Sequence, residues 1–532
     1  MMSKKLLIFR SILIILYPSF LIASCSGNDQ INKGQSTLSI DPVTPTIPSD
    51  IQPTTNANNL TIPDQVVFWI DPSINIQSNF PGWELIKDNL VEKKEIADFW
   101  IESAPSSDGF GMLLRESYFI VSVPFTSSVK NIELSSLKKI WSGDSIEFDN
   151  IRLWVSPNEF EQLTIFFRQA PLENVIISES EPDSCKLTEC WKITKFENSD
   201  PKWRIISIDG FSLLSHDFDP ELYPFVERIF LQKNPISNQE ITFPFEINVQ
   251  SNFDPAHLTS LLMTGTTALV RNTAFQIEEN GLDFPLENIQ DLLDSVDLIH
   301  ISNEVPFYSK CPSAVPVRKE MRFCSDPKYM EILKMMGVDI VELTGNHLLD
   351  WGPDAFLETL SLYRENNIKT FGGGATFEMA RKPLIIENNG NKLAFIGCNV
   401  PGPENDWVSD ERPGSLPCDL DELENTVRDL RKQGYIPIFT FQHYEFDYFQ
   451  VNNLLKQDFW RMAEAGAVIV SGSQAHFPQG IDFVGSSFVH YGLGNFLFDQ
   501  MYKYWGMASI DIHYFYENKY INTLQIPIKN EN

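Results

Sequence analysis

Hydrophobic runs of strand length alternate with amphipathic stretches of helix length from residue 65 onward. Between residues 65 and 240 this alternation predicts a first α/β domain. The strand-like runs are Gln65–Ile70, Tyr118–Val123, Ile151–Val155 and Trp203–Ile208. The helix-like stretches are Leu134–Trp141, Glu159–Gln169 and Pro220–Phe230.

A second region, residues 255–532, has hydrophobic runs that each end in a polar cluster. Buried strands that alternate with helices predict a largely parallel sheet, and ligands bind at the carboxyl ends of such strands. We therefore expect the polar clusters to converge on one cleft. The runs are Ser260–Met263, Val296–Ile301, Val338–Leu343, Tyr435–Phe441 and Ala467–Val470. The helix-like stretches are Pro327–Met336, Pro353–Glu365, Asp419–Lys432 and Leu454–Ala465.

Residues 1–25 have the pattern of a signal peptide. Basic residues precede an apolar run, Ile12–Ile22, that is too short to be a comfortable membrane span. The following residues, Leu21–Cys25, resemble the cleavage site of bacterial lipoproteins. We expect cleavage before Cys25, a lipid on that cysteine, and an extracytoplasmic location on a bacterial cell membrane. The alternative is an ordinary signal peptide in which the cysteine occurs by chance.

Composition and charge narrow the classes of partner. Residues 26–64 are rich in Ser, Thr, Pro, Asn, Asp and Gln, which predicts a disordered tether. Hydrophobic residues make up 43% of the whole chain, enough for two folded domains. The net charge of −30 argues against nucleic acid or anionic lipid as a partner, because both bind cationic surfaces.

The chain has seven cysteines, and six remain when Cys25 is set aside. An even number in an exported chain favours disulfides. A zinc site is the alternative, but no CxxC spacing or Cys/His cluster supports it. Pairing between sequence neighbours is our expectation, although other pairings fit the same count. The expected pairs are Cys185–Cys190, Cys311–Cys324 and Cys398–Cys418.

Five polar residues of the second region follow predicted strands and carry candidate chemistry. Carboxylate, amide oxygen and imidazole together suit a divalent ion of Zn, Mn, Fe or Mg. Such an ion activates water or polarises a phosphoryl or carbonyl oxygen, and His347 is a candidate general acid. The alternative for each histidine is an ordinary loop or core residue. The five are Glu304, Asn346, His347, His443 and His476.

Four motifs of the second region resemble those of the CapA family of capsule or poly-γ-glutamate synthesis proteins. They are Thr344–Gly352, Gln442–Glu445, Gly472–Gly480 and Tyr491–Asp499. The resemblance implies a four-layer α/β/β/α, calcineurin-like metallophosphatase fold. It also implies an anionic surface polymer as partner, such as poly-γ-glutamate or capsule polysaccharide. The resemblance assigns His347 as acid, and as metal ligands Glu304, Asn346, His443 and His476.

Two departures from the family pattern weaken the expected metal site. Thr266 stands where the family has a metal-binding aspartate, and Gln474 replaces the first histidine of the late pair. Both are neutral and weak ligands, so one metal ion or none is expected. Arg271 is retained, either to contact an anionic group or to form a structural ion pair. Asp350 either orients a neighbouring histidine or caps the helix near Pro353.

The first domain resembles one lobe of the periplasmic solute-binding proteins. The segments that carry this resemblance are Val123–Gly143 and Trp203–Gly210, followed by Tyr223–Phe225. A generic α/β domain without a ligand is the alternative. Three functions remain open: a metal-assisted hydrolase or transferase that acts on surface polymer, a non-catalytic polymer-binding lipoprotein with a degenerate site, and a solute receptor.

Overall fold

A computed structural model describes residues 66–72, 74, 83–103, 111–144, 148, 150–186, 189–239, 249–317, 320–446, 448–499 and 506–530. The predicted signal peptide, Cys25 and the tether lie outside these ranges. Residues Leu60–Asn532 form one compact unit, so the boundary that we expect between residues 240 and 255 stays a prediction. Within the described ranges, no helix combines the length and the apolar character that crossing a membrane requires.

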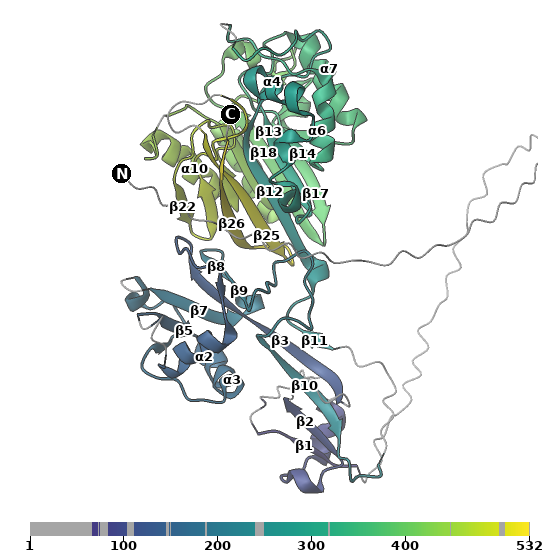
Figure 1. The fold of residues 1–532 in the computed structure, drawn as a ribbon, viewed down its shortest axis with the longest axis vertical. Coiled ribbons are helices and arrows are strands. Elements are labelled where there is room, and N and C mark those ends of the chain that lie inside the picture. The colour runs from purple at the N-terminus through teal and green to yellow at the C-terminus, as the bar shows by residue number, and fades with distance from the viewer. Residues whose placement is uncertain are drawn as a thin grey trace, which may run out of the picture. The chain divides into compact units, whose positions relative to one another are not determined.

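The first part of the described chain is built on one sheet around the long strand β3 (Gly111–Pro124). One half of β3 pairs with β10 (Val226–Lys233), and the other half pairs with β7 (Cys190–Lys195). Apolar residues of α2 (Leu134–Ser142) and α3 (Pro157–Phe167) share a buried cluster with these strands (Figure 1). The other strands are β1 (Phe68–Ile70), β2 (Phe99–Ser103), β5 (Arg152–Val155), β6 (Val175–Ile177), β8 (Trp203–Ile205) and β11 (Gln250–Ser251).

The helix expected over Pro220–Phe230 is wrong, because residues from Val226 onward form β10. Glu227, Ile229 and Leu231 are buried while the residues between them are half-buried. This period of two belongs to a strand that covers a core with one face. The other two predicted helices of this part are confirmed as α2 and α3, with small shifts of their ends.

The second part contains two sheets of mixed direction. In the first sheet, β12 to β15 are parallel and β25 and β26 are antiparallel additions. In the second, β18, β20, β21 and β23 are parallel. The first comprises β12 (Leu258–Thr267), β13 (Leu298–Asn303), β14 (Ile340–Glu342), β15 (Lys369–Phe371), β24 (Asn495–Leu497), β25 (Met507–Tyr516) and β26 (Lys519–Lys529). The second comprises β17 (Leu384–Asn388), β18 (Asn391–Asn399), β20 (Ile436–Gln442), β21 (Ile469–Ser471), β22 (Ile481–Val484) and β23 (Ser487–His490).

Three hydrophobic clusters define the layers of this part. Leu261 and Met263 of the first sheet share one cluster with Ile436 and Ile438 of the second, so the two sheets face each other. Helices on the opposite face of each sheet complete an α/β/β/α arrangement, as expected (Figure 1). On the first sheet they are α4 (Arg271–Asn280), α6 (Met330–Met335) and α7 (Pro353–Glu365). On the second they are α9 (Leu420–Lys432) and α10 (Asn453–Ala465).

The three expected disulfides are present, each between sequence neighbours. The Cys311–Cys324 bond closes the loop after β13, and the Cys398–Cys418 bond links β18 to the residues before α9. Both bonds therefore fix loops at the ends of strands, where the candidate site residues lie.

Candidate metal centre

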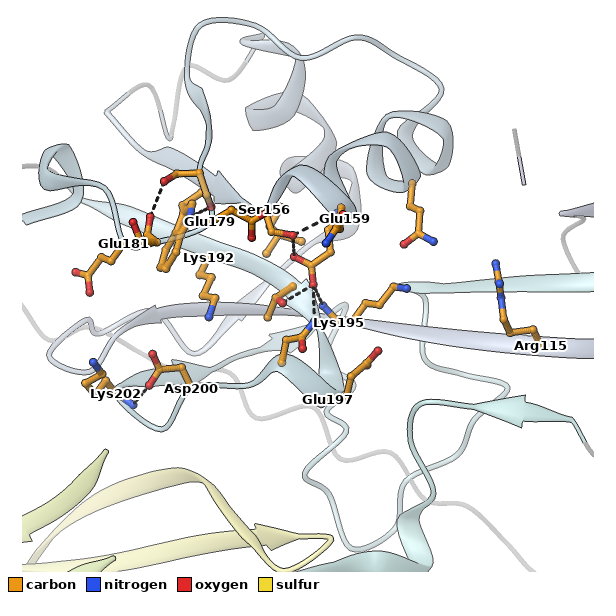
Figure 2. A pocket seen from close by; sticks show the side chains of 18 of the residues that line it. Arg115, Ser156, Glu159, Glu179, Glu181, Lys192, Lys195, Glu197, Asp200 and Lys202 are labelled. Carbon is orange, nitrogen blue, oxygen red and sulfur yellow. Dashed lines mark hydrogen bonds between the residues drawn. The ribbon is translucent and has the colours of Figure 1, made fainter. Parts of the chain in front are cut away.

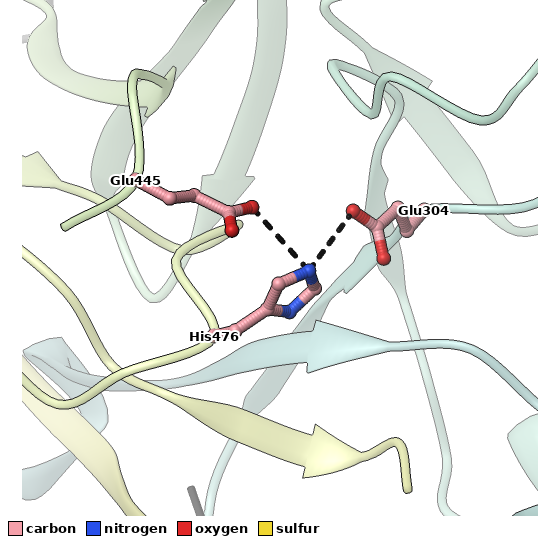
Figure 3. A group of neighbouring side chains, drawn as sticks. All are labelled: Glu304, Glu445 and His476. Atoms are coloured by element: carbon pink, nitrogen blue, oxygen red, sulfur yellow. Dashed lines mark ion pairs between the residues drawn. The ribbon is translucent and has the colours of Figure 1, made fainter. Parts of the chain in front are cut away.

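Loops at the carboxyl ends of three strands bring together a buried histidine and two glutamates. Glu304 follows β13, Glu445 follows β20, and His476 lies in the loop after β21. His476 Nε2 lies 3.6 Å from Glu304 Oε1 and 3.3 Å from Glu445 Oε1. Their candidate ligand atoms all lie within 4.8 Å of one another (Figure 3). The convergence that the strand pattern predicts is real for Glu304 and His476.

The orientation of His476 favours metal binding by one ring nitrogen. Its Nδ1 lies 2.8 Å from Asn495 Oδ1, so Nδ1 carries the proton in the neutral ring. The lone pair of Nε2 then faces the two carboxylates. A side-chain oxygen that fixes the tautomer of a ligating histidine is a usual second layer of metal sites.

Glu304 supplies the physical test of whether a cation fits this group. Its side chain is fully buried, and neither carboxylate oxygen has a hydrogen-bond partner among the described residues. Burial raises the pKa of Glu304, and the neighbouring His476 opposes that shift only in part. A buried carboxylate without donors is costly, whereas a bound cation would compensate it. Two carboxylates and one imidazole are hard or borderline ligands that fit a divalent ion.

His347 and Asp350 form a second pair beside this group. His347 Nδ1 lies 2.9 Å from Asp350 Oδ2, and the same carboxylate accepts from the amide of Phe323 at 2.7 Å. Burial alone would lower the pKa of His347, but the bond to Asp350 and the charge of Glu304 raise it above its usual value. The protonated form is thereby favoured, as a general acid requires. Asp350 orients the histidine, and the cap position of α7 is Gly352 without a side-chain cap bond.

Two other predicted site residues are occupied by structural partners. Arg271 pairs with Asp499, with Nη2 2.8 Å from Oδ1. In His443, Nε2 lies 2.9 Å from Asp458 Oδ2 and Nδ1 accepts from the amide of Tyr444 at 2.8 Å. Both ring nitrogens of His443 are thus engaged, and the structure does not bring it into the carboxylate–imidazole group. Its expected role as a ligand stays a prediction, as does that of Arg271 toward an anion.

Among the neutral residues of the predicted site, Thr266 and Gln474 are buried and Asn346 is half-buried. The hydroxyl of Thr266 lies 3.4 Å from the carbonyl of Ala475. Gln474 is buried, and neither its amide oxygen nor its amide nitrogen has a partner among the described residues. Asn346 Oδ1 lies 3.4 Å from Gln442 Nε2. The side chain of Gln474 therefore remains available to a ligand, whereas Asn346 is linked to Gln442, the last residue of β20 in the second sheet.

Sequence reasoning missed two acidic residues near this centre. Glu445 stands in a motif that carries the family resemblance, but its neighbour His443 was the predicted ligand. Asp406 is buried, and burial together with the charge of Asp350 raises its pKa to about 7. No motif marks Asp406, since its burial depends on how the loop after β18 packs beside His347.

A larger cavity of about 880 Å³ lies in the first part of the chain, beside β5, β7 and the start of α3 (Figure 2). Its lining includes both acidic and basic side chains. Lys192 points into it with Nζ 5.0 Å from the ring centre of Trp154, and burial lowers the pKa of this lysine. Among the described residues Lys192 makes no ion pair. The charged lining residues are Arg115, Glu159, Glu179, Glu181, Lys192, Lys195, Glu197, Asp200 and Lys202.

Two facing sheets between helices, with a carboxylate–imidazole group at the strand ends, define a metallophosphatase-like domain. Residues 260–500 match the family described as bacterial capsule synthesis protein PGA_cap. This match covers a little under half of the chain, and within it the chain is similar to that family.

Two curated relatives support this assignment. The chain is 24% identical to the PGA biosynthesis protein CapA of Bacillus subtilis (strain 168) over 229 residues, 42% of this chain and 59% of the relative. It is 22% identical to the capsule biosynthesis protein CapA of Bacillus anthracis over 246 residues, 45% of this chain and 60% of the relative. The matches thus span about three fifths of either relative, which is less than two thirds.

Similarity to solved structures is low. The NAD nucleotidase NadN of Haemophilus influenzae gives a TM-score of 0.33 at 10% identity, over 51% of this chain and 50% of that chain. An ABC-type phosphate transport receptor of Vibrio cholerae gives 0.21 at 11% identity, over 27% of this chain and 70% of that chain. Such scores add nothing to the fold described above, and the likeness of the first part to a solute-binding lobe stays a prediction.

Proposed function

We propose that this chain is a membrane-anchored CapA-like protein in the synthesis, export or attachment of a capsule or poly-γ-glutamate type of surface polymer. The observation that carries the proposal is the Glu304–Glu445–His476 group in a domain of the PGA_cap family. Both curated relatives carry names that refer to capsule or PGA biosynthesis. The substrate is an anionic polymer or its precursor.

The proposed chemistry is metal-assisted hydrolysis or group transfer. Glu304, Glu445 and His476 would hold one divalent ion, which when bound polarises a phosphoryl or carbonyl oxygen or activates water. His347, whose pKa is raised, donates a proton to the leaving group. Asp350 holds the ring of His347 through Nδ1, so that its Nε2 is the nitrogen that faces the reaction.

The location belongs to the proposal as well. Cleavage before Cys25 and lipid attachment there would place the folded part outside the bacterial cell membrane, on a tether formed by residues 26–64. Three disulfides support an oxidising, extracytoplasmic compartment. Labelling of cells with a radioactive fatty acid tests this: the wild-type chain takes up label and the C25S variant does not.

A non-catalytic, polymer-binding lipoprotein is the second candidate function. Thr266 and Gln474 favour it, since both are buried and neither is a strong metal ligand. Under this alternative, the domain holds or guides polymer without breaking a bond.

Metal analysis of the chain from residue 26 onward separates the two candidates. We expect about one divalent ion per chain after dialysis, and its loss in H476A. The matched control is H216A, which removes an exposed histidine in the first part of the chain. Hydrolase or transferase activity that disappears with chelator and returns with metal supports the enzyme. A wild-type chain without bound metal, and with unchanged function in H476A cells, would leave only the binding protein.

A further inference from the structure

The candidate metal centre is divided between the two facing sheets. Glu304 comes from the end of β13 in the first sheet, whereas Glu445 and His476 follow β20 and β21 in the second. The spacing of the ligand atoms therefore depends on how loops of different sheets are held against each other. Apolar packing between the sheets is not directional, whereas a hydrogen-bonded tie near the strand ends would help to fix this spacing.

Glu342 makes such a tie. It is the last residue of β14 in the first sheet, and its side chain is fully buried. One carboxylate oxygen accepts a hydrogen bond from Thr344 Oγ1 at 2.6 Å, and the other accepts from Ser473 Oγ. Thr344 begins the loop that carries His347, whereas Ser473 lies in the loop of the second sheet that carries His476. One carboxylate thus joins two loops that are far apart in the sequence.

No positive charge among the described residues explains this buried carboxylate. The basic group that pairs with it is His300, whose Nε2 lies 3.6 Å from Glu342 Oε2. Burial lowers the pKa of His300 to about 3, so its ring is neutral. The hydroxyls of Ser302 and Thr440 also face the carboxylate, although neither meets it with ordinary hydrogen-bond geometry. Hydrophobic residues at such a position are often as stable or more stable, so packing alone gives no reason for a glutamate.

The loops that Glu342 joins are closely packed. A side chain in place of Gly345 would lie 2.8 Å from Glu304 Cα, and one in place of Gly472 would lie 2.0 Å from the carbonyl oxygen of Tyr491. The carbonyl of Thr344 also accepts from Asn399 Nδ2 at 2.9 Å. In such packing, a shift of either loop moves the site residue that follows it.

We infer that Glu342 is a positioning residue that holds the His347 loop of the first sheet and the His476 loop of the second in one relative arrangement, and thereby sets the geometry of the metal centre. The inference rests on the proposed metal site for its functional meaning. Glu342 touches no ligand atom and acts only through Thr344 and Ser473.

The test compares S473A with S260A in the chain from residue 26 onward. S473A removes the hydroxyl that links Glu342 to the second sheet. S260A removes another serine–carboxylate bond, partly buried, from Ser260 Oγ to Asp297 Oδ2 at 2.7 Å, near the start of β12. E342Q keeps the shape of the side chain with one acceptor oxygen fewer, and S473T restores a hydroxyl. All variants are examined by thermal unfolding, so that loss of folding is detected separately.

Two readouts decide the inference. In metal-free protein, hydrogen exchange of the loops at residues 344–347 and 472–476 is expected to rise together in S473A and E342Q, and to stay unchanged in S260A. Affinity for Mn²⁺ or Zn²⁺ is expected to fall about 10- to 100-fold in S473A and to recover in S473T. Exchange that rises only at residues 472–476, or an equal loss of affinity in S260A, overturns the inference. If the wild-type chain binds no metal, the proposed function fails, while the exchange of the two loops still decides the role of Glu342.

Discussion

Two buried glutamates, one in each part of the molecule, have the same side chain and opposite surroundings. Glu159 in the first part is 4% exposed, and Glu304 in the second is 0% exposed. Glu304 has no hydrogen-bond donor among the described residues. The carboxylate of Glu159, in contrast, accepts four hydrogen bonds. Their donors are Ser156 Oγ, Thr194 Oγ1, the amide of Lys195, and Asn198 Nδ2.

The difference shows that burial by itself does not mark a functional carboxylate. Glu159 lies at the start of α3 and ties that helix to β7, so its donors make it part of the fold. Glu304 has burial without donors, which leaves its charge to be balanced by something that the chain does not supply. The cavity beside Glu159 is therefore weaker evidence for a reactive site than the unpartnered carboxylate of Glu304.

The largest expected effect comes from exchanging each of these glutamates for glutamine. E304Q should abolish metal binding, and the metal-free protein should melt higher than wild type because an uncompensated buried carboxylate is gone. E159Q should leave metal binding intact and lower the free energy of unfolding by about 1–3 kcal/mol, since its donors lose an ionic acceptor. Titration calorimetry and thermal unfolding of both variants measure this. A stability loss in E304Q as large as that in E159Q would remove the contrast.

Asp406 is a third buried carboxyl group, and the pH dependence of stability tests its raised pKa. Its pKa is raised from 3.8 to about 7, chiefly by burial and then by Asp350, while His347, the amide of Leu349 and Arg412 oppose the shift. A raised acid pKa adds stability below pH 4, and that contribution is lost as the pH rises through 7. D406N stays neutral, so it should melt with wild type near pH 4 and above it at pH 8. Melting curves whose difference does not change with pH would contradict the raised pKa.

The smallest effect is expected at Lys192 in the large cavity. Burial lowers the pKa of Lys192, so its charge is disfavoured, while contact with the ring of Trp154 compensates part of that cost. K192M should therefore change the free energy of unfolding by less than about 1 kcal/mol. Chemical denaturation at neutral pH measures the difference. A loss of more than about 2 kcal/mol would show that the ammonium has a structural partner.

The strands of the second part that the sequence predicts are well marked, because a hydrophobic run and the polar cluster after it can be recognised within a few residues. Each hydrophobic run between Ser260 and Val470 became a strand, and each run carried its polar cluster to the strand end. Whether His443 or Glu445 lies beside His476 cannot be read from the neighbouring sequence. It depends on Asp458 in α10, which occupies the ring of His443 and leaves Glu445 as the side chain beside His476. Likewise, the strand over Val226–Lys233 is set by its pairing with β3.

The position of β12 in its sheet has a consequence for the order of assembly. Its neighbours are β13 and β25. β13 follows soon in the sequence, whereas β25 comes after all strands of the second sheet. Contacts between such distant segments form late in folding. The first sheet therefore closes only when residues 507–516 are available, and the residues of the candidate metal centre come together no earlier than His476. In a chain with this order, the closed first sheet and the assembled Glu304–Glu445–His476 group are among the last features to form.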